Sequence, residues 1–117
     1  SLYRYRNQIL MPGRADLPAG LLEDVKNYLD ITWDDEATDK KIGGLIASGM
    51  AYLDGKSGEA EDYTADGTPR MLLMEYVRYA RDSALDVYEN NYTNMILSMQ
   101  NERAVARYVE SAEQAEP

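Results

Sequence analysis

The chain has no cysteine, no histidine and no phenylalanine among its 117 residues, and it has a single tryptophan. The missing cysteine and histidine exclude disulfide bonds, thiol chemistry, most zinc and copper sites and every catalytic triad that uses histidine. The sequence also has no apolar run of the roughly 18 residues that span a bilayer, and no apolar stretch typical of a signal peptide. We therefore expect a soluble intracellular protein without a membrane partner.

Motifs for bound nucleotides, metals and catalysis are also missing. Neither IGGLIASG nor DGKSGE has the spacing G-x-x-x-x-G-K-[ST] of a phosphate-binding loop. Asp34, Asp35, Glu36 and Asp39 lack the alternating pattern of a calcium loop. No serine has a histidine to activate it, and the carboxylate pairs fall on expected outer faces of helices. The sequence predicts no enzyme, no cofactor and no metal site.

The net charge of -9 is unevenly distributed. Residues 1–13 contain two arginines and no acid, whereas residues 16–66 contain thirteen acids and four bases. An acidic body disfavours general nucleic-acid binding, which needs Lys and Arg to replace counterions on phosphates. In the loop at 55–67 the simplest interpretation of the acids is solvation, and the alternative is a functional acidic surface. The acids concerned are Glu59, Glu61, Asp62 and Asp66.

Tyrosine and methionine are abundant, with ten and six residues respectively. Tyrosine carries a hydroxyl that needs a partner, so its rings favour the edge of a core or an interface. Plain core packing is the simplest explanation for any one of them, but their number between 71 and 108 favours an additional contact with another subunit or partner. The candidate interface residues are Tyr76, Tyr79, Tyr92, Met95, Met99 and Tyr108.

Residues 1–19 show no helical period and contain several turn-forming residues, so they are expected to form an extended arm. Tyr3, Arg4, Tyr5 and Arg6 are predicted to contact a neighbouring protein, because this arm is too apolar for an idle tail. The simpler alternative is a disordered or tag-derived terminus.

The apolar periods predict an all-α domain at 20–109, a small bundle of about four helices around a long central one. An amphipathic helix is expected at 21–29 with Lys26 on its outer face, and a second at 35–53 with Thr32 or Asp34 as the N-cap. The central helix is expected to start at Thr68 and Pro69, to extend through 68–100, and to kink or break near Asn90. Residues 110–117 lose the period and are expected to fray.

These segments contain several short packing motifs. They are Val25-Lys26-x-Tyr28-Leu29-x-Ile31, Asp39, Ile42, Leu45-Ile46, Tyr52, Tyr76-x-x-Tyr79 and Glu89-Asn90-Asn91-Tyr92. With these motifs the chain resembles the head-tail connector, or adaptor, proteins of tailed bacteriophages and prophages. The resemblance covers about 80 of the 117 residues and includes no catalytic signature.

The resemblance implies a structural subunit that forms a ring, commonly about twelvefold, below the portal protein of the virion. Such a ring extends the DNA channel, lets DNA pass without specific binding, and docks the next connector, stopper or tail protein. The expected locations are the head-tail interface and, during assembly, the cytoplasm of the bacterial host. A ring needs two different patches on each subunit, and an acidic lumen would repel phosphates. On this hypothesis the acidic loop lies near the channel or on an axial face, with Glu59, Glu61, Asp62 and Asp66.

Two alternatives belong to other classes. One is a small helical DNA-binding phage protein, similar to a terminase small subunit or a regulator, that would use Arg4, Arg6 and Arg14. The other is a helical scaffold domain without a phage context. A salt-sensitive mobility shift on duplex DNA would favour the first.

Overall fold

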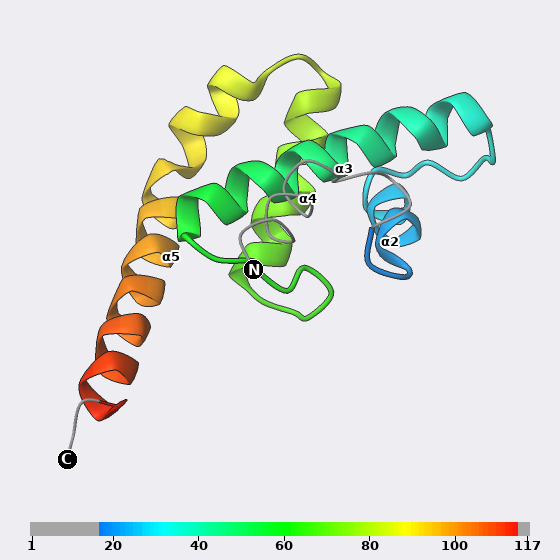
Figure 1. Cartoon of the computed structure of the whole chain (residues 1–117). Coiled ribbons are helices and arrows are strands. Elements are labelled where there is room, and N and C mark those ends of the chain that lie inside the picture. Colours follow the sequence, from blue (N-terminus) through cyan, green and yellow to red (C-terminus); the bar gives the residue numbers. More distant parts are fainter. Residues whose placement is uncertain (1–16, 115–117) are drawn as a thin grey trace, which may run out of the picture.

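The computed structural model describes residues 17–114, and within this range it contains helices joined by turns and loops, and no strands (Figure 1). The helices are α2 (Leu21–Tyr28), α3 (Glu36–Ser57), α4 (Thr68–Arg81) and α5 (Leu85–Gln114). The all-α expectation with about four helices is confirmed. Residues Tyr3, Arg4, Tyr5 and Arg6 of the predicted arm lie outside the described residues.

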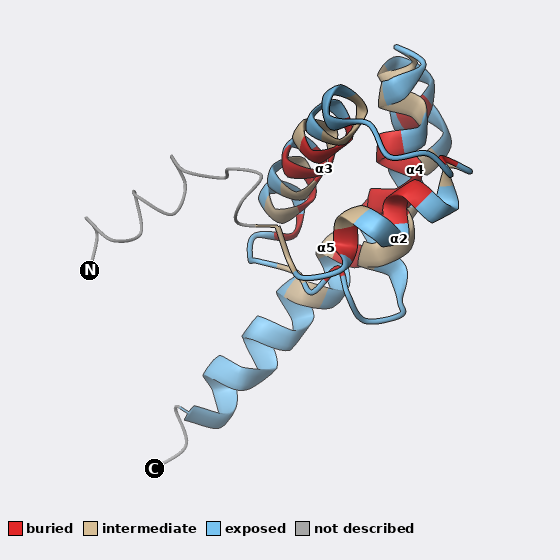
Figure 2. Cartoon of the chain, turned by 90° about the vertical axis from the view of Figure 1, so that its right-hand side faces the viewer, coloured by how far each residue is buried: buried red, intermediate tan, exposed pale blue. Residues whose placement is uncertain are grey.

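The core lies where α3, α4 and the first half of α5 meet, and α2 packs on α3 and α4. Figure 2 shows that the buried residues line the facing sides of these helices, while the second half of α5 projects from the body and is exposed. The fully buried aliphatic and aromatic side chains include Leu21, Val25, Ile46, Leu53, Leu72, Leu73, Val77 and Tyr88.

Helix α3 begins one residue later and ends four residues later than its pattern predicts. Asp35 is its N-cap, because the Asp35 carboxylate accepts hydrogen bonds from the Thr38 amide at 2.9 Å and the Thr38 hydroxyl at 2.7 Å. The helix continues through Gly55 and ends at Gly58, whose φ of 85° is the left-handed conformation that stops a helix. The predicted N-caps Thr32 and Asp34 are therefore wrong.

Gly49 of α3 packs directly against two side chains of α4. A Cβ atom at this position would stand 2.7 Å from Leu73 Cδ1 and 2.8 Å from Tyr76 Cδ1. A larger residue would therefore displace these two side chains, whereas glycine leaves them room. This contact explains why a residue that destabilises helices by about 1 kcal/mol relative to alanine stands inside α3.

The predicted single central helix is two helices, and the break comes before Asn90. The Ser83 amide donates to the Ala80 carbonyl at 3.0 Å, and the Ala84 amide donates to the Tyr79 carbonyl at 2.9 Å. With Ser83 at φ 57°, these bonds form the Schellman motif that closes a helix C-terminus. Serine occupies the left-handed position where glycine is the usual signal, so the pattern did not indicate this break. After it, α5 runs back along α4 (Figure 1).

Lys26 is buried, although its helical position predicts an outer face. Its ammonium lies 2.7 Å from the Asp39 carboxylate and 3.4 Å from that of Asp34. The contact with Asp39 raises the pKa of Lys26 above its ordinary value, although burial acts in the opposite direction. This cluster fastens α2 to the first turn of α3.

Helix α5 continues to Gln114, whereas the sequence predicts fraying from residue 110. Every residue from 104 to 114 is exposed. Apart from the contacts of Arg107 with Glu59 and Ser57, no tertiary hydrogen bond within the described chain holds this stretch. Its alanines and glutamates favour helix.

Candidate interaction surface

Three of the predicted interface tyrosines belong to an aromatic cluster inside the body. Tyr76, Tyr79 and Tyr92 surround Tyr88, and the ring centroids of these pairs with Tyr88 are 5.5, 5.8 and 5.1 Å apart. Tyr52 of α3 completes the cluster. Tyr88 is fully buried and donates its hydroxyl hydrogen to the Leu72 carbonyl at 2.8 Å. The cluster therefore joins α3, α4 and α5.

Glu75 is a buried carboxylate at the junction of α2, α4 and α5. It accepts hydrogen bonds from the Tyr28 hydroxyl, from the Tyr92 hydroxyl at 2.8 Å and from the Arg78 guanidinium at 2.7 Å. The Arg78 hydrogen bonds, reinforced by the two tyrosines, lower the pKa of Glu75 to about 2. The sequence reasoning missed this residue; an acid between Met74 and Tyr76 on an apolar helix, one turn before an arginine, was the available signal.

The loop between α3 and α4, residues 58–67, is held by buried polar groups at its start. Asp54 Oδ1 accepts hydrogen bonds from the Tyr63 hydroxyl at 2.6 Å and from the Glu61 amide at 3.0 Å. The Ser57 hydroxyl donates to the Glu59 carbonyl at 2.8 Å. Tyr63 itself is buried, and its burial raises its pKa. The loop is therefore a fixed part of the body.

Two of the four predicted acidic residues in this loop form ion pairs with the second half of α5. Arg103 contacts Glu61 through two hydrogen bonds of 2.7 and 2.8 Å, and only 4% of the Glu61 side chain is exposed. The Arg103 hydrogen bonds lower the pKa of Glu61. Arg107 contacts Glu59 at 2.8 Å and the Ser57 carbonyl at 3.1 Å. The negative charge of Glu59 and Glu61 is thus compensated by α5.

The other two acids lie apart from this contact. Asp62 accepts hydrogen bonds from the Thr64 amide at 2.9 Å and the Thr64 hydroxyl at 2.6 Å, which lower its pKa and shape a local turn. Asp66 is exposed and lines a groove beside α2. The four predicted residues therefore do not present one continuous acidic surface.

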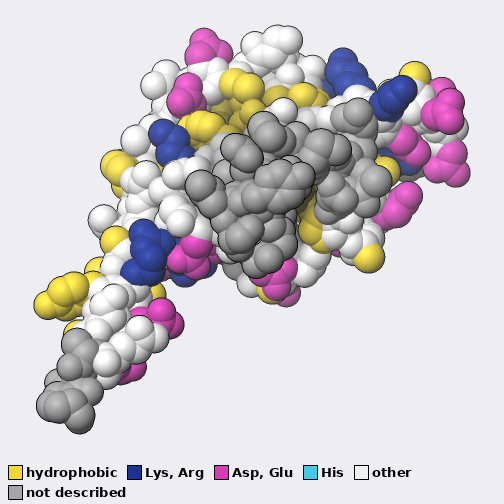
Figure 3. Space-filling view, viewed as in Figure 1, with side chains coloured by type: hydrophobic (Ala, Val, Ile, Leu, Met, Phe, Trp, Pro, Cys, Tyr) yellow, Lys and Arg dark blue, Asp and Glu magenta, His cyan; other side chains and the backbone are white. Residues whose placement is uncertain are grey.

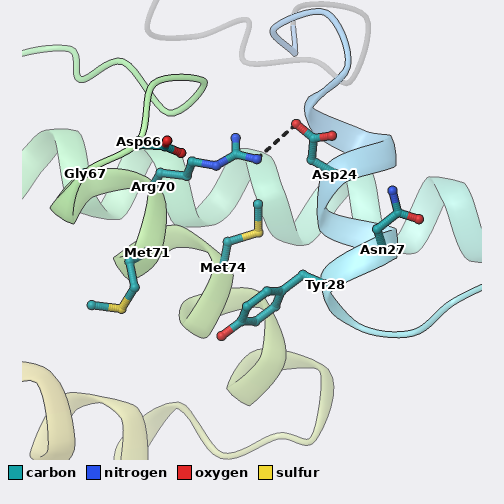
Figure 4. A pocket seen from close by; sticks show the side chains of 8 residues that line it. All are labelled: Asp24, Asn27, Tyr28, Asp66, Gly67, Arg70, Met71 and Met74. Atoms are coloured by element: carbon teal, nitrogen blue, oxygen red, sulfur yellow. Dashed lines mark hydrogen bonds and ion pairs between the residues drawn. The ribbon is translucent and has the colours of Figure 1, made fainter.

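That groove is an open space of about 570 Å³ between α2 and the start of α4 (Figure 4). Arg70 reaches across it and pairs with Asp24 at 3.1 Å. Its remaining lining consists of Asn27, Tyr28, Asp66, Gly67, Met71 and Met74. Because the arginine is already paired with Asp24 and with the Tyr63 carbonyl, the groove has no spare positive group for an anion.

Two sets of residues on α5 have the same spacing of four, three and four residues and lie on opposite faces of the helix. Tyr88, Tyr92, Met95 and Met99 have this spacing and face the body, where Met99 is buried and Met95 half-buried. The same spacing recurs nine residues later, and nine steps of about 100° turn a helix by about 180°. We call this second set the outer stripe: Leu97, Asn101, Ala104 and Tyr108, with Val105 beside it.

The outer stripe is exposed, and its largest side chain is the most exposed of the large apolar residues. Tyr108 is 74% exposed, Val105 60% and Leu97 49%. Hydrophobic side chains on the projecting part of the molecule are visible in Figure 3. Of the predicted interface residues in the described range, Tyr108 is thus the one that the folded chain leaves uncovered, whereas Tyr76 and Met99 are buried.

The charges of the second half of α5 that lack a partner among the described residues are acidic, because both arginines of this half pair with the loop. Glu102, Glu110 and Glu113 form no ion pair within residues 17–114. The last turn of α5 contains no basic residue. Acids at the C-terminal end of a helix face the negative end of its dipole, so this end of α5 has a negative potential without compensation from the described chain.

No family model matches this chain, and neither a curated protein nor a solved structure matches it. None of the helices in the described range is long and apolar enough to cross a membrane. Residues 17–114 also contain no group of three or more acids arranged to hold a metal ion.

Proposed function

We propose that this chain is a structural connector subunit of a tailed phage or prophage, which assembles into a ring below the portal. The ring would extend the DNA channel and dock the next connector, stopper or tail protein. The observation that supports this proposal most is the outer stripe, an apolar strip on a projecting helix that the chain itself leaves exposed. Exposed apolar surface of this kind is typical of a protein contact.

The shape of the chain suits a heterologous contact. A ring requires that each subunit present one patch to the next subunit and a different patch to the previous one. The projecting half of α5 offers one patch away from the body, and the body offers other surfaces to receive it. The burial of Tyr76 and Met99 moves the proposed contact from the α4 tyrosines to the end of α5.

The alternative of a small DNA-binding protein receives less support. Phosphate binding needs free basic side chains. In α5, Arg103 and Arg107 already pair with Glu61 and Glu59, and the neighbouring glutamates would repel phosphates. Arg4, Arg6 and Arg14 lie outside the described residues.

Self-association tests the proposed function directly. We expect the purified chain to form oligomers by light scattering and rings in electron micrographs. The double variant Val105→Asp/Tyr108→Asp should have a lower mass, because two charges would enter the subunit contact. A matched control is Trp33→Asp, since Trp33 is also half-exposed but lies before α3. A monomeric chain at every concentration, or equal loss of mass in the control, would contradict the proposal. Genes for portal and major capsid proteins beside this one would support it independently.

A further inference from the structure

The exposed surface of the second half of α5 combines the apolar outer stripe with negatively charged side chains. The outer stripe supplies Leu97, Val105 and Tyr108. At about 100° per residue, Glu102 and Glu113 lie on the Val105 side of the stripe, whereas Glu110 lies on the opposite side of the helix. A helix is about 10–12 Å across, similar to the distance of about 8–10 Å over which salt screens charges. A charged segment lying on the stripe therefore interacts electrostatically with these glutamates. Such a surface selects a partner that is both apolar and basic.

The same chain contains one segment with this composition. Residues 1–14 carry Arg4, Arg6 and Arg14 and no acid, in a protein whose net charge is -9. The apolar residues of this segment are Leu2, Tyr3, Tyr5, Ile9, Leu10 and Met11. Arginines of this segment facing Glu102 and Glu113, which form no ion pair within residues 17–114, would compensate part of the charge of the second half of α5. The apolar residues of the segment would cover the outer stripe.

From this complementarity we propose that residues 1–14 of one copy dock on the outer stripe of α5 in a neighbouring copy. The inference rests on the proposed function, and it names the segment that covers the exposed stripe in the assembly. The stripe from Leu97 to Tyr108 is about 17 Å long, so about five extended residues can cover it. The remaining residues of the arm are enough to bridge two subunits.

The position of α2 favours a second copy over the same chain. The arm leads into α2, which lies on the opposite side of the body from the projecting end of α5 (Figure 1). Residues 1–16 span at most about 55 Å when fully extended, and the long dimension of the structure is 58 Å. An arm that stayed on its own chain would use much of its length in crossing the body.

Cysteine cross-linking tests this contact, because the chain has no cysteine of its own. One preparation carries Tyr5→Cys, and a second, with a different affinity tag, carries Val105→Cys. After mixing and mild oxidation we expect a disulfide between the two differently tagged chains. The control is Lys41→Cys, an exposed position on α3, which should yield several-fold less product with Tyr5→Cys. Equal yields with Val105→Cys and Lys41→Cys would overturn the proposal.

A charge exchange gives a second readout on the full-length chain. Arg4→Glu/Arg6→Glu should weaken self-association about five- to tenfold, the effect of losing two exposed ion pairs. Adding Glu102→Arg/Glu113→Arg, the two acids beside the stripe, in the same chain should restore much of the affinity. If the second pair of changes weakens association further, the proposal is wrong.

The mass of the unmodified chain separates the two claims. Oligomers that form without a disulfide between Tyr5→Cys and Val105→Cys would overturn the arm contact and leave the ring proposal intact. A disulfide that forms only within one chain carrying both cysteines would contradict the second copy as the partner. A strictly monomeric protein without any cross-link would contradict both.

Discussion

The two halves of α5 belong to one continuous helix and have opposite relations to the rest of the molecule. In the first half, Tyr88, Ile96 and Met99 are buried, and the rings of Tyr88 and Tyr92 join the aromatic cluster. In the second half no residue is buried, and the contacts with the body are the ion pairs of Arg103 and Arg107. The first half is stabilised by apolar packing, and the second is attached through charged side chains.

This difference separates the apolar residues that stabilise the fold of a single chain from those that do not. Burial of a large side chain contributes roughly 1.5–3 kcal/mol, so the inward residues of the first half stabilise the fold. Tyr108 and Val105 contribute no comparable burial within the described chain. Their position on the side of the helix away from the body is instead suited to a contact with another molecule.

The largest expected effect comes from applying the same substitution to both halves. Tyr88→Ala removes a buried ring and its hydrogen bond to the Leu72 carbonyl, and it should lower the free energy of unfolding by about 3–5 kcal/mol. Tyr108→Ala should change it by less than about 0.5 kcal/mol, because the ring is exposed. Urea unfolding at low protein concentration measures both values. If both variants lost a similar amount of unfolding free energy, the two halves of α5 would not differ in their contribution to stability.

A smaller effect is expected from Glu75→Gln, which keeps the shape of the side chain and removes its charge. The variant should lose about 1–3 kcal/mol at neutral pH, because the hydrogen bonds from Arg78, Tyr28 and Tyr92 to a carboxylate are weakened. Folding lowers the pKa of Glu75 from 4.5 to about 2, so its contribution is complete above pH 4.5 and is lost as the pH falls toward 2. The difference between the two proteins should therefore shrink between these pH values in thermal unfolding. A constant difference would contradict the assignment.

Removing either arginine of the second half should have the smallest effects on stability. The two variants also show how strongly each ion pair attaches this half to the body. Arg103→Ala should destabilise the fold by about 1–2 kcal/mol, since it leaves the buried Glu61 carboxylate without its main partner. Arg107→Ala should cost less than about 1 kcal/mol, because Arg107 and Glu59 are both about half exposed. Thermal unfolding of the two variants measures the ranking. If Arg107→Ala were the more damaging, the loop would be held mainly by the outer pair.

The helical fold and much of its core could be predicted from the sequence, because they follow from apolar periodicity. The patterns of Leu21, Val25, Ile42 and Ile46 indicated helices whose buried faces the structure confirms. The break between α4 and α5 was misplaced because serine and glycine adopt the left-handed conformation with different frequency, and Ser83 gives no local signal. The long-range pairs could not be predicted, since Arg103 and Glu61 are 42 positions apart.

The candidate surface was predicted less well, because a tyrosine or methionine pattern does not show which side of a helix faces the body. Tyr76 and Met99 were expected at an interface and are buried, whereas Tyr108 was expected there and is exposed. The position of the arm, with Tyr3 and Arg4, stays a prediction from the sequence. The ring and the phage context also remain proposals.

The Schellman turn at Ser83 has a mechanical consequence for α5. A helix of 30 residues is a rod about 45 Å long, so a tilt of about 10° near Leu85 would move its tip by about 8 Å. The tyrosine cluster fixes the N-terminal end of α5 to the body, and the ion pair between Arg103 and Glu61 fixes it again nearer the C-terminal end. In a ring of identical subunits the angle between the two contact patches determines how many copies close the circle. In such a ring, the angle that the Ser83 turn and the tyrosine cluster impose on α5 would help to determine the number of subunits.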